Sequence, residues 1–507
     1  MARSTGSRVR AERFGVTASA LVLVPLGLYM LVLIGLGLWG RREGGSLEGY
    51  YVAGKKLPSW VIAFSSNATG ESGWLLLGLT GMGYAVGFHA LWVVFGEVMG
   101  VAIAWTLVSR PFKEYTDRYR AITVPDYLEQ RFRDRRQLLR KLSIAIILSM
   151  VAVYCCAQLV ATGKAFSSFL GFSYVTGVFL GAGVTIVYTA VGGFKAVAYS
   201  DLVQGLLMVG GLVMLPIVGI AAAGGWNEVI GALETADPNL LRAMGSHGAT
   251  WAGVLSAVSF AGIGLAFLGV PQLLTRFMSA ASGRELVRGG RVAVVCMVLF
   301  DVGAVFTGIA GRALFPLLDD PETVMPTMSA ELFPALFTGI FLVIVLGAIM
   351  STVDSLLILA SSAVVRDFGQ KILGAARGDG RLSRYGKFVT AFVGLVAIPF
   401  ALWEPPQLFW FMLFAWSGLG GAFVPVILCS LFWKRTTLPG ALAGMAAGFA
   451  VTVVWVTQFK EAYYDLYELI PGLIAGTAAT VIVSLRTKPP EGAAAEFEDV
   501  HATVRGS

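Results

Sequence analysis

The chain has 507 residues, of which 56% are hydrophobic and only 14% are charged, and its mean hydropathy is +0.74. Soluble proteins carry about 25% charged residues, so this composition argues against a soluble enzyme or a nucleic-acid-binding protein and indicates many membrane helices. The formal net charge of +7 then belongs to cytoplasmic loops, where membrane proteins concentrate Lys and Arg.

Apolar runs of roughly 20 residues, the length that crosses the ~30 Å hydrocarbon layer, predict thirteen membrane helices. The tenth and thirteenth are short, so twelve is the alternative count. We expect an N-terminal tail (1–16), one membrane domain (17–485) and a tail (486–507) that is too short to fold alone and hangs free in the cytoplasm. The thirteen helices cover residues 17–39, 58–86, 89–109, 142–166, 173–191, 200–223, 250–268, 291–314, 335–365, 388–402, 408–432, 439–459 and 470–485.

Basic loops orient the predicted helices. The segment Arg110–Lys141 carries ten Arg and Lys against five Asp and Glu, and basic residues also fill the loops after the seventh and ninth helices. By the positive-inside rule these loops are cytoplasmic, which places the N-terminus outside and the C-terminus inside. Four arginines in the N-terminal tail oppose this orientation.

The second helix contains Ser65–Gly73, nine small or polar residues in the middle of a span. Gly70 and Gly73 are free to unwind, and Glu71 is an acid at membrane depth, where ionisable groups are costly and usually functional. We therefore expect a break near Ala68–Gly73. The plain alternative is an acid near a helix end that pairs with a base.

Three later helices carry related signals. Asp201 opens the sixth helix, and the seventh is interrupted by three glycines between Gly262 and Gly269 and by Pro271. A pair of interrupted spans in corresponding halves of a chain points to the site of a transporter with inverted repeats. Asp301, deep in the eighth helix, has no evident partner except Arg312.

The ninth helix carries Ser351, Thr352, Asp354 and Ser355, with apolar residues on both sides. Ser351 and Ser355 share a face because they are four residues apart. Hydroxyls combined with bare carbonyls of a broken helix make an all-oxygen site suited to a small alkali cation. Hydrogen bonding of these hydroxyls within their own helix is the alternative.

In this order, several motifs make the chain resemble the sodium/solute symporter family over roughly residues 17–485, and within it the sodium/proline branch. The motifs are Ser72-Gly73-Trp74-Leu75-Leu76 with Gly78-Leu79, Val124-Pro125-Asp126-Tyr127, Gly192-Gly193-Phe194, Pro271 with Arg276-Phe277-Met278, Met350-Ser351-Thr352 and Gly440-Ala441-Leu442-Ala443-Gly444-Met445.

The resemblance implies an all-α polytopic membrane protein of about thirteen helices, with inverted five-helix repeats of the leucine-transporter type at about 58–223 and 250–432. It implies a sodium site formed by the carbonyls of Ala68, Glu71 and Ala348 and by the hydroxyls of Ser351 and Thr352. Asp201 matches an acid beside that site, and Asp354 is a second candidate coupling or gating acid. The positions that match the substrate-lining residues of the family are Ser72, Gly73, Trp74, Tyr154, Ile263 and Phe267.

Three positions depart from the proline branch. Gly70 replaces an aspartate, and the nearest acid is Glu71, about 100° further around the helix. Ile263 replaces a tryptophan and Phe267 a tyrosine. These changes alter the volume and polarity of the expected pocket.

Together these observations predict a secondary active transporter, not an enzyme, without a cofactor and with sodium as the coupling ion. It would carry proline, another amino acid or a carboxylate across the cell (inner) membrane by alternating access. The expected partners are the solute, sodium and membrane lipid, with no nucleic acid and with a monomer as functional unit. The alternatives are a proton-coupled carrier or exchanger that uses Glu71, and a membrane solute sensor that does not transport.

Overall fold

A computed structural model describes residues 20–506 except 376–377, 403–407 and 461–465. The predicted N-terminal tail, 1–16, lies outside the described residues. The described chain is helical without strands; one isolated bridge joins Leu57 and Ala280. Eleven helical runs are long and apolar enough to cross a membrane. Two of them, Ser59–Arg118 and Tyr174–Ala222, each contain two of the thirteen predicted helices.

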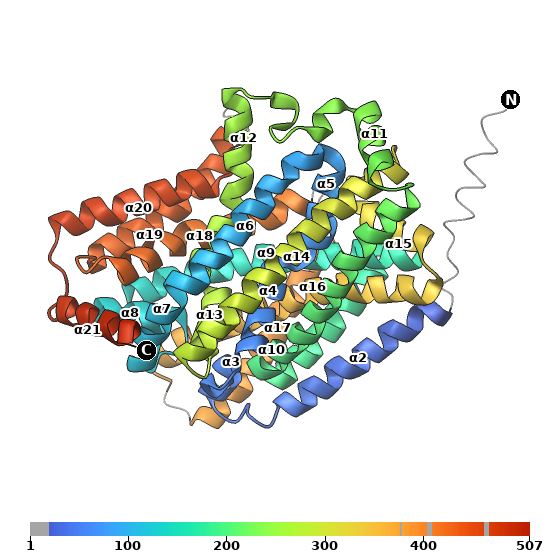
Figure 1. Ribbon diagram of the computed structural model, residues 1–507. Coiled ribbons are helices and arrows are strands. Elements are labelled where there is room, and N and C mark those ends of the chain that lie inside the picture. Colours follow the sequence, from blue (N-terminus) through green and yellow to red (C-terminus); the bar gives the residue numbers. More distant parts are fainter. Residues whose placement is uncertain (1–19, 376–377, 403–407, 461–465, 507) are drawn as a thin grey trace.

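The first part of the chain forms a bent series of helices (Figure 1). Short π-helical or 3₁₀ turns connect several of them, so adjacent helices run on with little or no loop. Their bounds are α2 Ala20–Gly40, α3 Leu47–Val52, α4 Ser59–Gly73, η2 Trp74–Leu79, α5 Thr80–Val86, η3 Gly87–Ala90, α6 Leu91–Ile103, η4 Ala104–Val108, α7 Ser109–Arg118, α8 Val124–Phe132, α9 Leu138–Leu170 and α10 Tyr174–Ala222.

The second part repeats the use of long helices with one clear interruption, between α12 and α13. The bounds are α11 Trp226–Ala236, α12 Trp251–Gly262, η7 Ile263–Leu268, α13 Pro271–Ser279, α14 Gly283–Leu314, α15 Val324–Leu332, α16 Ala335–Ser362, η9 Ala363–Ile372, α17 Asp379–Ala401, α18 Leu408–Phe432, α19 Leu438–Val454, η10 Trp455–Phe459, α20 Leu469–Arg486 and α21 Ala493–Gly506.

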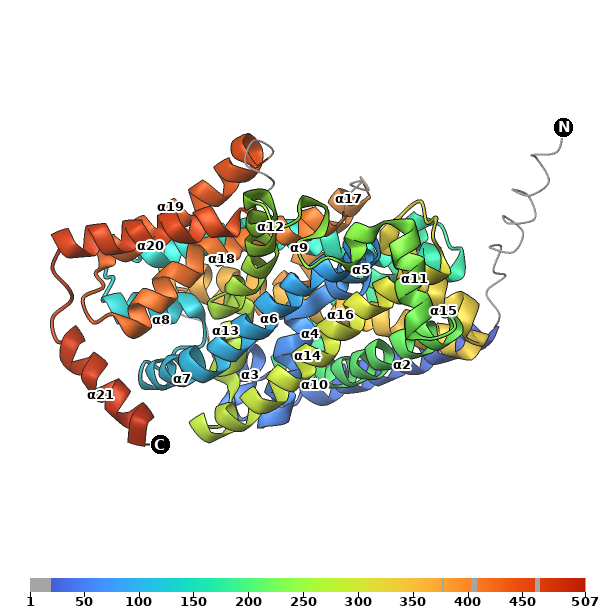
Figure 2. The ribbon, with the colours of Figure 1, turned by 45° about the horizontal axis from the view of Figure 1, so that its top comes forward.

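Helix α16 lies at the centre of the bundle. It packs against α2, α4, α9 and α10, and every residue from Phe341 to Ser362 is buried. Helix α2, in contrast, lies on the periphery and exposes Leu21, Leu28 and Leu31. Figure 2 shows α2 along one outer edge, with α18, α19 and α20 at the opposite end. The site described below therefore lies in the protein interior, beside α16.

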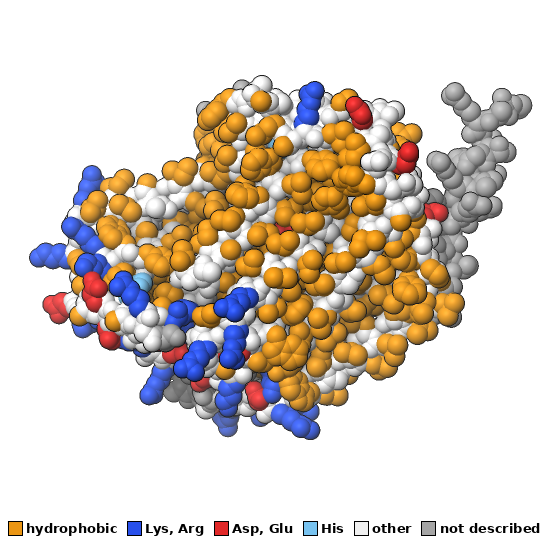
Figure 3. Space-filling view, viewed as in Figure 1, with side chains coloured by type: hydrophobic (Ala, Val, Ile, Leu, Met, Phe, Trp, Pro, Cys, Tyr) orange, Lys and Arg blue, Asp and Glu red, His pale blue; other side chains and the backbone are white. Residues whose placement is uncertain are grey.

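Charge divides the surface as the loops predicted. Figure 3 shows apolar side chains across the broad face formed by α2, α10, α14 and α6, while Lys and Arg gather at one end, around α7, α13 and α21. At this end Arg140 is buried and binds Asp126, Glu129 and Asp367, and Arg366 also binds Asp126. Part of the basic segment 110–141 is thus not a solvent-exposed loop, because its Arg140 is buried in an ion-pair network.

The sequence had suggested a free C-terminal tail. In the structure, residues Ala493–Gly506 form the amphipathic helix α21, which packs against the rest of the protein. Val500 is fully buried, and His501 Nε2 lies 2.8 Å from the carbonyl oxygen of Leu431. Arg118 contacts both Asp499 and Thr503. The expectation was wrong because a fourteen-residue helix that is unstable alone becomes stable when it buries one face.

Candidate functional site

The first interrupted helix breaks at Ser72, at the end of α4. Ser72 has φ 55° and ψ −168°, whereas the residues around it are helical, Gly73 included. The break lies inside the segment Ala68–Gly73 where it was expected, and the residue that leaves the helical conformation is Ser72, not one of the two glycines. A physical reason is at hand: the Ser72 Oγ accepts the N–H of Trp74 at 3.2 Å, and the N–H of Gly73 donates to Gln158 Oε1 at 3.2 Å. Side chains thus satisfy the backbone groups at the break.

The second interruption lies where the sequence predicted it. Helix α12 ends at Gly262, a 3₁₀ segment follows, and α13 begins at Pro271, which needs no N–H partner there. This segment lies against α6 with almost no gap: a Cβ on Gly264 would come within 1.9 Å of the carbonyl oxygen of Gly96. Glycines on both elements permit this approach.

The two breaks meet at one position. A Cβ on Gly70 would lie 2.6 Å from Cε1 of Phe267, so the aromatic ring rests directly on the backbone of α4. The ring of Trp416, from α18, packs edge-on against Phe267 at 5.1 Å, and its Nε1 donates to the carbonyl of Ile263 at 3.2 Å. Trp416 was not among the predicted site residues, because nothing in the sequence of α18 marks which of its faces meets the broken helices.

A small cavity of about 10 Å³ lies between these elements, which is room for about one water molecule. Three of the predicted substrate positions line it, and Ser72 and Gly73 belong to the adjoining break. Met412, Leu413, Trp416 and Glu97 are lining residues that the sequence did not reveal. The cavity is lined by Gly70, Trp74, Glu97, Tyr154, Ile263, Met412, Leu413 and Trp416.

Four of the five predicted sodium ligands lie together between α4 and α16. The Ser351 Oγ donates to the carbonyls of Ala68 and Ala348, both at 2.9 Å. The Thr352 Oγ1 lies 3.0 Å from the carbonyl oxygen of Thr69 and 3.4 Å from that of Ala348. The two hydroxyls therefore face the carbonyls of the α4 segment that precedes the break.

Glu71 is separate from these groups. Its carbonyl accepts the N–H of Trp74, and among the described residues no hydrogen bond joins it to Ser351 or Thr352. Its side chain lies instead beside those of Glu97 on α6 and Asp301 on α14.

The predicted coupling acids meet around a buried arginine. Arg276 Nη2 lies 3.1 Å from Asp201 Oδ2 and 2.6 Å from Thr69 Oγ1, and it also contacts Ser355. Asp201 accepts a further bond from Ser65 Oγ at 2.6 Å, and Asp354 is bonded to Tyr188 and Ser355. Arg276 belongs to the basic segment after the seventh predicted helix, which was expected to be a cytoplasmic loop, yet its side chain is only 1% exposed. The short helix α13 that follows the break carries it back into the bundle.

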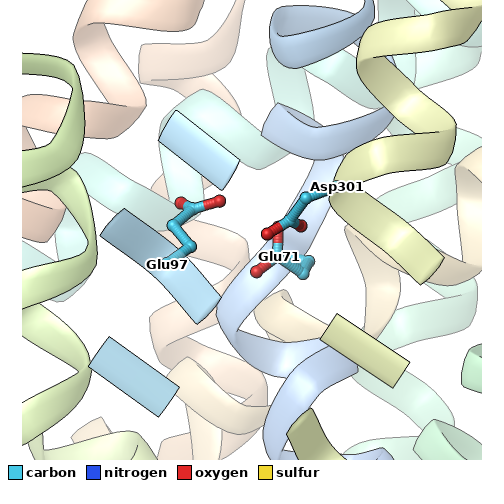
Figure 4. Close-up of side chains that lie close together, drawn as sticks. All are labelled: Glu71, Glu97 and Asp301. Carbon is cyan, nitrogen blue, oxygen red and sulfur yellow. The ribbon is translucent and has the colours of Figure 1, made fainter. Parts of the chain in front are cut away.

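A third group consists of three buried carboxylates: Glu71 from α4, Glu97 from α6 and Asp301 from α14 (Figure 4). Each offers one oxygen, and these oxygens all lie within 4.8 Å of one another. The suggested partner of Asp301 was wrong, because Arg312 Nη1 donates to Tyr84 Oη at 3.2 Å and to the carbonyl of Pro316 at 2.9 Å. Glu97, an acid inside an apolar span like Glu71, could have been noticed by the same criterion.

Comparison with known proteins supports the resemblance. The profile of the Sodium:solute symporter family matches residues 50–448. The high-affinity proline transporter PutP of Bacillus subtilis is 34% identical over 475 residues, which cover 92% of this chain and 99% of that protein. The sodium/proline symporter of Salmonella typhimurium is also 34% identical, over 94% of this chain and 95% of its own.

Solved structures show a similar architecture at low sequence identity. A Na⁺-coupled sialic acid symporter aligns over 92% of this chain and 98% of its own with a TM-score of 0.77 at 18% identity. The nucleobase-cation-symport-1 transporter Mhp1 aligns over 89% of this chain and 98% of its own, with a TM-score of 0.55 at 14% identity. MhsT, solved with L-phenylalanine, aligns over 84% of this chain and 97% of its own, with a TM-score of 0.53 at 15% identity. The fold is of the leucine-transporter type, as the sequence predicted.

Proposed function

The chain belongs to the sodium:solute symporter family, and on that premise we propose where it binds sodium and what kind of solute it carries. It is a multi-pass protein of the cell membrane and a secondary active transporter in which sodium drives symport of a small solute by alternating access.

We propose that sodium binds between α4 and α16, at the carbonyls of Ala68 and Ala348 and the hydroxyls of Ser351 and Thr352. The observation that carries this proposal is that both hydroxyls reach across to α4 carbonyls at 2.9 and 3.0 Å instead of bonding only within α16. Such oxygens form the hard, uncharged ligand set that a small alkali cation takes. Asp201 and Asp354, held by Arg276 and Ser355 next to this position, then act as coupling or gating acids.

The proposed solute is a small amino acid in the cavity between the two breaks. The 34% identical relatives are proline transporters, and Trp74, Tyr154 and Ile263 line the cavity with the break at Ser72 beside it. At about 10 Å³ the cavity is too small for an amino acid, so the Phe267 and Trp416 side chains must move to admit one. Ile263 and Phe267 stand where the proline branch has a larger and a more polar residue. The preferred solute is therefore an amino acid with a side chain different from that of proline.

We further propose that the end around α7, α13 and α21 faces the cytoplasm and that the N-terminus lies outside. The gathering of Lys and Arg at that end supports this orientation. The division of the membrane domain into repeats at about 58–223 and 250–432, and the monomer as functional unit, stay predictions.

The sodium site is tested with the double variant Ser351→Ala/Thr352→Ala in proteoliposomes. We expect sodium-dependent amino-acid uptake to fall by at least tenfold, because removal of two of four ligands costs about 1.4 kcal/mol or more of sodium binding. Thr106→Ala is the control, since that exposed hydroxyl bonds only to the carbonyl of Ala102 in its own helix. Wild-type sodium dependence in a correctly folded double variant would contradict the site.

A further inference from the structure

The carboxylates of Glu71, Glu97 and Asp301 lack the counter-charge that such a group requires. All three are at most 1% exposed. Among the described residues, no ion pair joins any of them to Lys, Arg or His. Both oxygens of Glu71, both of Asp301 and Oε2 of Glu97 have no hydrogen-bond partner within the described chain.

Like charges this close in a low-dielectric interior cannot remain ionised together without a cation. The charged groups that face the cluster from the helices around it are the three acids themselves, and the polar neighbours are Trp74, Tyr154 and Tyr467. None of these neighbours carries a positive charge. Protonation can neutralise the three groups one by one, whereas a single cation that enters from elsewhere satisfies all three together.

The cavity between the two breaks is the space from which such a cation would reach the cluster. Glu97 lines this cavity together with Trp74, Tyr154 and Trp416, and its carboxylate lies close to those of Glu71 and Asp301 (Figure 4). Aromatic faces next to a carboxylate form the usual environment of an organic cation.

Geometry favours nitrogen over a metal ion. Three oxygens that lie within 4.8 Å of one another are each no more than about 2.8 Å from a common point, which is the length of a charge-assisted N–H···O bond. A protonated primary amine has three N–H donors, one for each carboxylate. Calcium takes six to eight oxygens, and the aromatic and aliphatic side chains on the cavity side offer few.

We propose that the solute carries a protonated primary amine and that this nitrogen docks among Glu71, Glu97 and Asp301. The proposal rests on the transport function given above and narrows it to amines, to the exclusion of sugars and of carboxylates without nitrogen. A primary amine satisfies all three carboxylates, whereas the secondary amine of proline has only two donors.

The test uses thermal shift of the purified full-length chain with matched pairs that differ in the amine: L-alanine and L-lactate, L-lysine and 6-hydroxyhexanoate, putrescine and butane-1,4-diol. L-Proline, glucose, CaCl₂ and MnCl₂ complete the panel. Stabilisation by mass action should occur with at least one primary amine and not with its partner lacking nitrogen. The amine that responds is then measured in titrations of Glu97→Gln, Glu71→Gln and Asp301→Asn.

Each of the three variants should weaken amine binding by about tenfold or more, because a charged acceptor becomes a neutral group. Glu228→Gln, the same change at an exposed position on α11, should leave the affinity unchanged. The melting temperature of each variant without ligand reports whether it folds, and Glu97→Asp, which keeps the charge, should retain part of the affinity.

Several results would overturn the proposal: stabilisation by an amine-free partner or by glucose, a stronger response to L-proline than to every primary amine, no response to any primary amine, or amine affinity that the three variants leave intact. A response to Ca²⁺ or Mn²⁺ that Glu97→Gln abolishes would assign the cluster to a metal ion instead. Sodium-dependent uptake of an amine-free solute would refute this inference and leave symport standing. The absence of sodium-dependent uptake of any solute would refute the proposed function itself.

Discussion

Glycine at position 70 and phenylalanine at position 267 form a matched pair of residues. The proline branch resembled by this chain carries an aspartate at the first position and a tyrosine at the second. Here the Phe267 ring occupies the space that a side chain at position 70 would need, with 2.6 Å between a Gly70 Cβ and its Cε1. In this chain the nearest acid is the next residue, Glu71, which lies beside Glu97 and Asp301.

Gly70→Ala should lower the free energy of unfolding by about 1–3 kcal/mol, since overpacking forces the ring to shift. In the double variant Gly70→Ala/Phe267→Ala, the costs of the two single substitutions should not add. We expect a coupling energy of at least about 0.5 kcal/mol in a double-mutant cycle measured by thermal unfolding. Gly183→Ala is the control, because nothing lies within 4 Å of its Cβ position. Additive costs would mean that the two residues do not contact each other.

At the scale of elements, the break in α4 depends on a residue that is not a glycine. Ser72 adopts a positive φ that L-residues with a Cβ rarely take, and such strain costs of order 1–3 kcal/mol and is concentrated at functional sites. Its hydroxyl offsets part of the cost by accepting the N–H of Trp74. The break is thus a balance between backbone strain and one local hydrogen bond.

Comparison of Ser72→Gly with Ser72→Ala isolates the backbone term, because both variants lack the hydroxyl. The Ser72→Gly variant should be more stable than the Ser72→Ala variant by about 1 kcal/mol, because glycine adopts this φ more easily. At Ser149, in the regular helix α9, the order should reverse, with alanine favoured by about 1 kcal/mol. The measurement is thermal unfolding of the four purified variants. Alanine as stable as glycine at position 72 would mean that the helix does not break there.

Helices and breaks could be predicted from the sequence where they depend on residues that are neighbours in the chain. Hydropathy identified the spans, and the glycines with Pro271 located the second break, because both depend on neighbouring residues. Prediction failed where the partner lies on another helix. The contacts of Asp301 with Glu71 and Glu97, the burial of Arg276 and the position of Trp416 follow from which helix faces meet, and no single sequence encodes that in a readable form.

At the scale of the whole molecule, the ion-pair network at the basic end ties separate parts of the chain together. Asp126, on α8, binds Arg140 from α9 and Arg366 from η9. Burial raises the pKa of the Asp126 carboxyl, but the guanidinium groups of Arg366 and Arg140 outweigh it, so the pKa lies below its ordinary value. Asp126 therefore contributes stability above its unfolded pKa of about 3.9, and that stability is lost as the pH falls through the folded pKa.

Asp126→Asn should cost about 3–5 kcal/mol of unfolding free energy, the usual cost when one partner of a buried charge pair is removed. The cost should be equal at pH 8 and pH 5, because Asp126 is ionised at both. Asp117→Asn is the matched control: that carboxylate is 44% exposed although it pairs with Lys55 and Lys113, so we expect a cost below about 1 kcal/mol. A cost for Asp126→Asn that shrinks between pH 8 and pH 5 would contradict the assigned pKa.

The terminal helix α21 has a consequence for the order in which the protein is made. The side chain of Arg110 donates to the carbonyl of Val504, a contact between residues 394 positions apart. Chains emerge from the ribosome N-terminus first, so α7 is made long before α21, the helix that binds it. Docking of α21 therefore comes after the membrane helices between the two have been inserted and packed. Until then the basic surface around α7 stays uncovered, and a misassembled bundle leaves it so.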